Sequence, residues 1–291
     1  MKDLINYDSP LSLISFLKQH GLGMQKKFGQ NFLINPSVRT MLLNELEIFP
    51  GDEVWEIGAG LGAMTAGLLE RDAHVSAFEI DKGFCNALRM IFNNDKKFLL
   101  IEGDAFITIQ DRYLENKKEI KMLGNLPYNI AAKLLGNFIE QRLMFSRLVI
   151  TVQREVAQRI TAKPGGADYS SLSVLVSSSY KIKPLSVLKG ECFFPSPHVE
   201  SQSLRLDLLP QNAAPPPLFY PMLRALFATR RKTIKNNLTA FMNSVKPNSG
   251  SLAISVLDSL KIEPHRRAEM LCCEDFAQLA WTLQEHLAVS S

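Results

Sequence analysis

Short runs of apolar residues alternate with amphipathic stretches along residues 36–160 of this chain. Five of the runs predict strands, because they are rich in Val, Ile, Leu and Phe and read as buried on both faces. They cover residues 53–57, 74–80, 97–103, 120–125 and 146–152. The stretches between them, such as 63–72 and 83–94, favour helices. This alternation predicts a parallel sheet with right-handed crossover connections.

The pattern changes after this region. Residues 171–188 and 199–209 alternate apolar and polar positions, which predicts an antiparallel pair of strands at the end of the sheet. The prolines of residues 209–219 then favour an extended linker. Beyond it, residues 221–242 place apolar side chains at helical spacing opposite a basic face, and further helices are expected up to Ser291.

We therefore expect an α/β domain over residues 1–210 and a small all-helical domain over residues 211–291. Residues 1–25 extend the first domain at its N-terminus. Their apolar positions are interleaved with polar ones, which predicts an amphipathic helix rather than a signal peptide. No run approaches the roughly 18 apolar residues that a membrane span requires. We expect no membrane partner and a cytoplasmic location.

Composition adds little to this picture. Of the 291 residues, 46% are hydrophobic and 21% are charged, which is ordinary for a globular protein. The net charge of +4 slightly favours an anionic partner. The four cysteines include no Cys-x-x-Cys pair, and the five histidines are scattered. We expect reduced structural thiols and no metal site.

The first predicted strand runs into a glycine-rich turn. Gly58, Gly60 and Ala63 match the G-x-G-x-x-G/A pattern, in which glycines let the backbone turn sharply and approach a ligand. Glu79 ends the second strand, where a carboxylate can accept hydrogen bonds from both hydroxyls of a ribose. NAD and S-adenosylmethionine (SAM) both carry such a ribose, so these residues do not separate the two cofactors. Asp81 is expected to cap the next helix.

Two later features favour SAM. Asp104 ends the third strand, where its carboxylate can accept a hydrogen bond from an adenine amine. The fourth strand ends in the tetrapeptide Asn125-Leu126-Pro127-Tyr128. A dehydrogenase has no need of this tetrapeptide, whereas an enzyme that methylates an amine does.

The chemistry explains why. The lone pair of adenine N6 is delocalised into the ring, so the nitrogen is a poor nucleophile. Acceptors aimed at its two N–H groups pull it toward tetrahedral geometry, and the Asn125 side-chain oxygen and the Leu126 carbonyl can supply them. Pro127 stiffens the turn, and Tyr128 offers a face on which an extruded base can stack. Because SAM carries a good leaving group, catalysis then depends mainly on proximity and orientation.

With these motifs in order along one chain, the sequence resembles the KsgA family of ribosomal RNA adenine N6,N6-dimethyltransferases. The resemblance runs over nearly the whole chain from Lys26. It rests on KFGQNFL (27–33), EIGAGLGAMT (56–65), Glu79-Ile80-Asp81, GDA (103–105), GNLPYN (124–129), FFPSPHVES (193–201) and RRKT (230–233).

The resemblance implies a Rossmann-like class I SAM methyltransferase domain with a mostly parallel seven-stranded sheet, followed by the helical domain. It also implies roles for individual residues. Asn31 and Leu33 would line the SAM site, Gly58 would lie under the methionine part, Gly60 would belong to the same turn, Glu79 would bind the ribose and Asp104 the adenine. Asn125 would lie beside the transferred methyl group, and Phe193 would stack on the target base opposite Tyr128. The alternative for Phe193 is a core aromatic, because Phe194 is its neighbour.

The implied reaction transfers four methyl groups to two adjacent adenosines near the 3′ end of 16S ribosomal RNA, in an assembling small subunit, by a monomeric enzyme. Basic residues are the expected RNA contacts: Lys26 and Lys27 near the N-terminus, and Arg230, Arg231 and Lys232 on the helix predicted at 221–242. On that helix Arg224, Arg231 and Lys235 would share one face. The alternative is a solvated basic face.

The sequence departs from the family in two places. Ala59 stands where the family often has proline, and Trp55 is bulky for its strand. Related enzymes that methylate large-subunit RNA share much of the architecture, but the RRKT segment and the Asn-Leu-Pro-Tyr form favour the small-subunit branch. Two other functions stay open, an NAD-dependent dehydrogenase and a non-catalytic binding protein on a methyltransferase scaffold.

Overall fold

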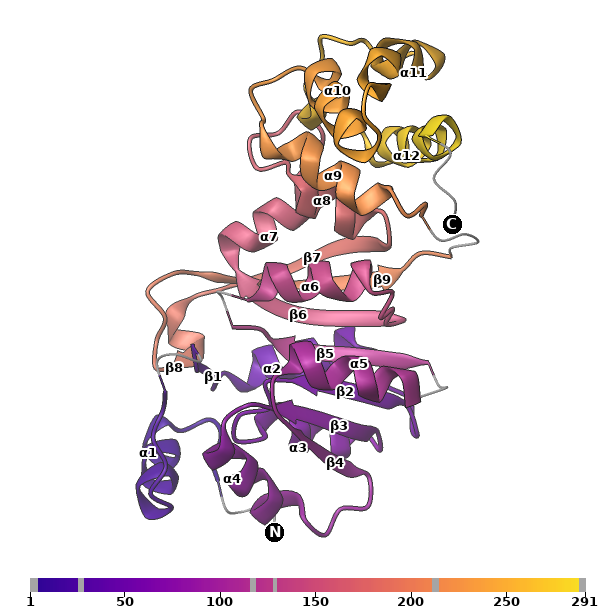
Figure 1. Cartoon of the computed structure of the whole chain (residues 1–291). Coiled ribbons are helices and arrows are strands. Elements are labelled where there is room, and N and C mark those ends of the chain that lie inside the picture. Colours follow the sequence, from indigo (N-terminus) through magenta and orange to yellow (C-terminus); the bar gives the residue numbers. More distant parts are fainter. Residues whose placement is uncertain (1–4, 26–28, 116–118, 128–129, 211–214, 288–291) are drawn as a thin grey trace. The chain divides into compact units, whose positions relative to one another are not determined.

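The structure is a computed structural model that describes residues 5–25, 29–115, 119–127, 130–210 and 215–287 (Figure 1). It divides into two compact units. The first comprises Met1–Ala157 and Lys181–Leu208, and the second comprises Gln158–Tyr180 and Leu209–Ser291. The later boundary lies two residues from the one expected at 210/211. The segment 158–180, however, belongs to the second unit, although we assigned it to the first.

Within the described residues, seven strands of the first unit form one sheet in the order β4-β3-β2-β5-β6-β9-β7. The strands β2 to β6 pair in parallel, and β9 runs antiparallel to β6, which confirms the expected fold class. The strands span Glu53–Ile57 (β2), His74–Glu79 (β3), Phe98–Glu102 (β4), Ile120–Asn125 (β5), Arg147–Gln153 (β6), Tyr180–Leu188 (β7) and Ser201–Leu208 (β9). A separate antiparallel pair joins β1 (Phe32–Leu33) to β8 (Phe193–Phe194).

Helices follow the strands of the first unit and lie on both faces of its sheet (Figure 1). They span Pro10–Gln19 (α1), Pro36–Glu45 (α2), Ala63–Leu69 (α3), Lys82–Phe92 (α4), Ala105–Glu115 (α5), Ala131–Glu140 (α6) and Arg154–Thr161 (α7). The second unit contains Ser171–Ser177 (α8), Phe219–Ala228 (α9), Ile234–Val245 (α10), Ala253–Ser259 (α11) and Cys273–Leu287 (α12). Short 3-10 turns lie at Gly190–Cys192, Ser249–Leu252 and Ala268–Met270.

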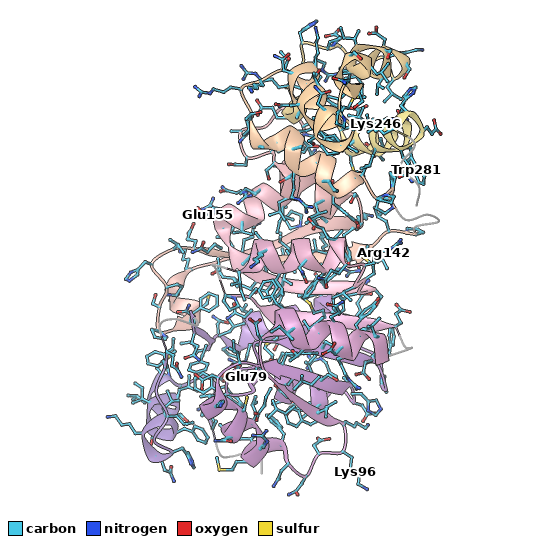
Figure 2. The ribbon with its side chains drawn as sticks, in the orientation of Figure 1. Glu79, Lys96, Arg142, Glu155, Lys246 and Trp281 are labelled. Atoms are coloured by element: carbon cyan, nitrogen blue, oxygen red, sulfur yellow. The ribbon has the colours of Figure 1, made fainter. Side chains whose placement is uncertain are left out.

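Alternate residues of β2 show how the sheet is buried on both faces. Val54 packs in a cluster with Leu43 of α2 and Leu68 of α3. Trp55 points to the other face and is fully buried, with its ring centroid 5.1 Å from that of Phe78. The side chains between sheet and helices fill this space (Figure 2). The bulky Trp55 is therefore a core residue of an aromatic layer and is compatible with the family fold.

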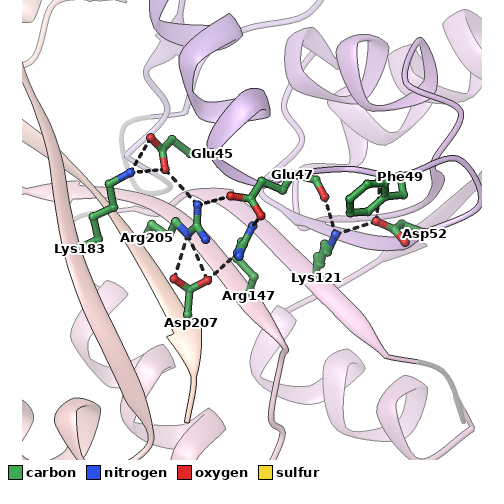
Figure 3. Close-up of polar contacts among 9 residues, drawn as sticks. All are labelled: Glu45, Glu47, Phe49, Asp52, Lys121, Arg147, Lys183, Arg205 and Asp207. Carbon is green, nitrogen blue, oxygen red and sulfur yellow. Dashed lines mark hydrogen bonds and ion pairs between the residues drawn. The ribbon is translucent and has the colours of Figure 1, made fainter. Parts of the chain in front are cut away.

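The amino ends of the central strands are occupied by ion pairs (Figure 3). Arg147, which opens β6, lies 2.5 Å from Glu47 and 2.6 Å from Asp207. Arg205 of β9 binds the same two carboxylates at 2.6 and 2.9 Å. The hydrogen bonds from Arg147 and Arg205 lower the pKa of Glu47 to about 2. Lys121 at the start of β5 pairs with Asp52 at 2.7 Å. The carboxyl ends, at the opposite edge, carry the pocket described below.

One predicted strand region is wrong in its first half, because Ser171–Ser177 forms the helix α8 and β7 begins only at Tyr180. Ser173 Oγ accepts a hydrogen bond from the Ser170 backbone N–H at 3.0 Å, which supports the first turn of the helix. The Tyr169 hydroxyl donates to the Leu271 carbonyl at 2.9 Å, so this segment is joined to the C-terminal helices. These contacts explain why residues 158–180 belong to the second unit.

The helix expected over residues 221–242 is also wrong as a single element, because it is broken into α9 and α10. The Thr233 side chain caps α10 by accepting from the Asn236 backbone N–H at 3.4 Å. Asn237 is buried, and its amide donates to the Leu226 and Thr229 carbonyls at the C-terminal end of α9 at 3.0 and 3.2 Å. A new helix therefore starts where the first one is terminated.

Candidate active site

A pocket opens at the carboxyl ends of the central strands of the first unit. This is where parallel α/β sheets bind ligands, because the turns after adjacent strands meet there. Eight of the residues predicted from the sequence line this pocket: Asn31, Leu33, Gly58, Gly60, Glu79, Asp104, Asn125 and Leu126. They come from segments far apart in the chain, so their convergence is a property of the fold.

The glycine turn after β2 needs its glycines. Gly58 has φ 76° and Gly60 has φ 58°, both in the left-handed region that side chains disfavour. A Cβ on Gly60 would also lie 3.2 Å from the ring of Phe32. The turn exposes backbone to the pocket and keeps it free of side chains, as a ligand that approaches the backbone closely requires.

Glu79 is held rigidly at the end of β3 (Figure 2). One carboxylate oxygen accepts from the Gly60 backbone N–H at 2.8 Å, and the other accepts from Ile80 and Asp81 at 2.9 Å each. Burial raises the pKa of Glu79, and these backbone hydrogen bonds oppose the rise. A buried carboxylate of this kind is suited to a ligand that brings hydroxyl donors.

Asp81 caps α4 as expected, because its carboxylate accepts from the Gly83 and Phe84 backbone N–H groups at 2.8 and 3.3 Å. It has a second set of partners that the sequence did not suggest. The side-chain amides of Gln25 and Gln30 donate to its other oxygen at 3.0 and 2.9 Å. The segment before β1 is thereby tied to the start of α4.

Asp104 lies at an exposed position of the pocket wall, after β4. Its carboxylate accepts from the Phe106 backbone N–H at 2.9 Å, at the start of α5. Ile80, which lines the same pocket, is 44% exposed. An apolar wall and a carboxylate together suit a flat heterocycle with an amino group.

The turn after β5 presents Asn125 in a defined orientation. The Asn125 amide nitrogen donates to the Asn31 carbonyl at 2.9 Å. Only the NH₂ end of an amide can face a carbonyl, so the side-chain oxygen is directed away from Asn31. The Leu126 N–H donates to the Thr151 carbonyl of β6 at 3.0 Å, and the Pro127 carbonyl accepts from Ile130 and Ala131 at 3.1 Å each. Tyr128, the fourth residue of the motif, lies outside the described residues.

The structure does not bring Phe193 into the pocket. Phe193 is 3% exposed and belongs to a core cluster with Leu33 and Leu43. Its strand pairing with Leu33 turns the ring inward, so it takes the core position that was the alternative, and the expected stacking role has no support here. Phe194, its neighbour, is only partly buried and packs with Phe32.

Glu56 is a pocket residue that sequence reasoning missed. It is 4% exposed, and the Thr65 hydroxyl donates to its carboxylate at 2.5 Å. Burial raises its pKa to about 8, although the hydrogen bond from Thr65 lowers it. An acidic residue inside a strand that is otherwise buried was the available signal. Tyr7 and Leu13, from the N-terminal extension, also line the pocket, and no sequence signal indicated this.

The basic residues of the second unit fall into two groups. Arg230 is engaged locally, because it pairs with Glu269 at 2.9 Å and donates to the Ala167 carbonyl at 3.1 Å. Arg231 and Lys232 are exposed in the turn between α9 and α10. The Ile234 N–H donates to the Arg266 carbonyl at 2.7 Å, which brings a second basic segment, residues 265–267, alongside this turn. Lys26 and Lys27 lie outside the described residues.

Two structural findings limit other functions. Among the residues that the structure describes, no group of three or more His, Cys, Asp or Glu side chains is arranged to hold a metal ion. In the same part of the chain, no helix combines the length and the apolar character needed to cross a membrane.

Comparisons with known proteins agree with this geometry. The family model described as ribosomal RNA adenine dimethylase matches residues 21–279. A ribosomal RNA small subunit methyltransferase A of Treponema denticola is 43% identical over 94% of each chain. A protein of the same name from Borreliella afzelii is 37% identical over 96% of this chain and 95% of its own. A dimethyladenosine transferase of Plasmodium falciparum shares the fold, with a TM-score of 0.74 at 24% identity over 87% of this chain and 97% of that one.

Proposed function

This chain belongs to the ribosomal RNA adenine dimethylase family, and we propose that it dimethylates N6 of two adjacent adenosines near the 3′ end of 16S ribosomal RNA in the small subunit. That it is a SAM-dependent methyltransferase acting on ribosomal RNA adenine follows from the family. The choice of the small subunit is supported by relatives named for that subunit that match 94–97% of this chain.

The pocket residues fit SAM. Along the sheet edge, Asp104 follows β4, Glu79 ends β3, Gly58 follows β2 and Asn125 ends β5, in the order in which these strands are paired. We assign the adenine to Asp104, the ribose hydroxyls to the Glu79 carboxylate and the methionine part to the turn at Gly58. Gly60 keeps the turn open, and Asn31 and Leu33 form the wall contributed by the segment around β1.

SAM supplies a methyl group on a sulfonium cation, which makes it a good leaving group. The protein's own contribution is to hold the target amine. The Asn125 side-chain oxygen and the Leu126 carbonyl accept hydrogen bonds from the two N–H groups of N6, so that its lone pair points toward the methyl group. Because the cationic donor needs no strong base, the displaced proton passes to water. We retain Tyr128 as the stacking residue for the base.

The observation that carries this mechanism is the hydrogen bond from Asn125 to the Asn31 carbonyl. It fixes the amide before substrate arrives, so that the side-chain oxygen is preorganised for the amine. It also couples the catalytic turn to Asn31, a pocket residue from another segment of the chain.

RNA contact is assigned to exposed cations of the second unit. Arg231 and Lys232 are retained from the expected set, and Lys26 and Lys27 stay in it as proposals. Arg230 already has Glu269 as an ionic partner, so we expect it to contribute less. Arg267 and His265 are added, because the segment that carries them lies beside the turn of Arg231. Such cations bind phosphates and give a salt-dependent affinity.

The proposal is tested with small subunits from cells that lack this protein. Incubation with labelled SAM should transfer methyl groups to two adjacent adenosines, mapped by primer extension and mass spectrometry of the dimethylated nucleosides. Labelling of large-subunit RNA, or of a single adenosine, would contradict the proposed substrate. No transfer to any RNA would favour a non-catalytic binding protein. Sedimentation of the active protein and fractionation of cells test the proposed monomer and cytoplasmic location.

A further inference from the structure

The N-terminal extension reaches the methyl-donor pocket. Residues 5–20 precede the part of the chain that the family model matches, which begins at residue 21. Even so, Tyr7 and Leu13 line the same pocket as Gly58 and Glu79. We infer that residues 5–25 close the end of this pocket that receives the amino-acid part of the donor, with Tyr7 as a binding residue there. This inference rests on the proposed function.

The extension is packed against the glycine turn. The buried face of α1, formed by Leu13, Phe16 and Leu17, clusters with Leu61 of the turn and Phe84 of α4. Ser9 caps the helix by accepting from the Ser12 N–H at 3.3 Å. The apolar face predicted from the sequence is therefore covered within the first unit.

Polar contacts hold both ends of the extension. Asp8 forms an ion pair with Arg39, whose guanidinium also donates to the Leu33 carbonyl at 2.9 Å. At the other end, Gln25 donates to Asp81, which caps α4. The extension is thus joined to α2, β1 and α4, three elements around the pocket. A segment attached only by chance packing would not need this set of contacts.

Tyr7 lies at one defined end of the pocket. Its hydroxyl donates to the Leu61 carbonyl at 2.9 Å, inside the glycine turn. Burial raises the pKa of Tyr7, and the nearby Glu56 carboxyl raises it further, so the hydroxyl stays protonated. Both neighbours, Leu61 and Glu56, flank the turn after β2, which we assigned to the methionine part. Asp104, assigned to the adenine, follows β4, two strands away.

The ligand chemistry follows from these groups. A Tyr hydroxyl that donates to Leu61 still has lone pairs to accept a hydrogen bond from an ammonium group. Glu56 offers a carboxyl at the same end of the pocket. Together they fit the amino-acid end of the donor, and the ring of Tyr7 covers the pocket from water. Loss of the ring should therefore weaken only ligands that possess the amino-acid part.

The test uses two ligands that share adenosine and a thioether. S-adenosylhomocysteine has the amino-acid part, and 5′-methylthioadenosine does not. We expect Tyr7→Ala to weaken the first about tenfold, as expected for removal of one hydrogen-bonding group, and the second less than twofold, by calorimetry. Tyr7→Phe should weaken the first about threefold. Leu11→Ala serves as a control, because Leu11 is 78% exposed on α1.

The outcomes separate the two levels of the argument. Equal weakening of both ligands by Tyr7→Ala would show that Tyr7 only supports the fold, and unchanged binding would place it outside the site. Either result overturns this inference but leaves the proposed function standing. A wild-type protein that binds neither ligand would overturn both. If Tyr7→Ala does not fold, Tyr7→Phe decides with the same two ligands.

Discussion

Replacement of Asn125 by alanine tests the chemical step. The side chain has two functions that the structure separates: its nitrogen donates to the Asn31 carbonyl, and its oxygen is the proposed acceptor for the target amine. Loss of the first costs about 1 kcal/mol, a typical net value for one hydrogen bond, so SAM affinity should fall by less than tenfold. Loss of the second removes a preorganised polar group, for which a comparable loss is roughly 100- to 1,000-fold in rate. The effect on rate should therefore exceed the effect on binding.

Single-turnover assays with saturating SAM and small subunits isolate this step, because binding then no longer limits the rate. Asn86→Ala is a matched control, since Asn86 is an exposed asparagine on α4 of the same unit. Asn125→Asp retains an acceptor oxygen but loses the donor to Asn31, so it should recover part of the rate. A wild-type single-turnover rate for Asn125→Ala would mean that the side chain only shapes the turn, and the mechanism would have to be abandoned.

Three further predictions concern the cofactor site, pH and RNA. Glu79→Ala should weaken SAM binding roughly tenfold to a hundredfold through loss of charge-assisted hydrogen bonds, measured by calorimetry; unchanged affinity in a folded variant would remove Glu79 from the ribose site. Glu56→Gln should flatten the pH dependence of stability: between the ordinary pKa of 4.5 and about 8 the folded chain keeps a proton that the unfolded chain loses, so wild-type stability should fall relative to the variant by about 1.4 kcal/mol per pH unit. Parallel urea-unfolding profiles at pH 5, 6.5 and 8 would show that Glu56 is ionised in the folded state. The double variant Arg231→Ala, Lys232→Ala should lower the slope of log affinity for small subunits against log salt by about 0.7–0.9 for each phosphate that no longer binds a cation of the protein, without altering SAM affinity; an unchanged slope would make these residues a solvated face.

The strands that build the site could be predicted closely from the sequence. Residues 53–57 and 120–125 coincide with β2 and β5, because buried parallel strands appear as short apolar runs that end in a turn signal. The turn residues then follow from the topology, since consecutive parallel strands bring their carboxyl ends to one edge. This is why the sequence alone could place Gly58, Glu79 and Asn125 together.

Features that depend on contacts between distant segments could not be predicted in this way. Phe193 and Phe194 are chemically identical neighbours, and only the pairing of β8 with β1 decides which of them turns into the core. The break after α9 depends on a buried amide, Asn237, that finds the carbonyls of Leu226 and Thr229 across the turn. Helical periodicity continues through this break, so the pattern of apolar residues alone predicts one helix.

The N-terminal extension shows the same limit at the functional site. Its amphipathic pattern correctly predicted α1, but periodicity identifies a buried face without identifying what covers it. The hydrogen bond between Tyr7 and Leu61 joins residues 54 positions apart, and neither residue type suggests a ligand site by itself. Once Leu61 is known to lie in the glycine turn, however, any segment that packs on Leu61 must border the space that the glycines keep open. The position of the extension at the pocket is therefore a consequence of where its apolar face is buried.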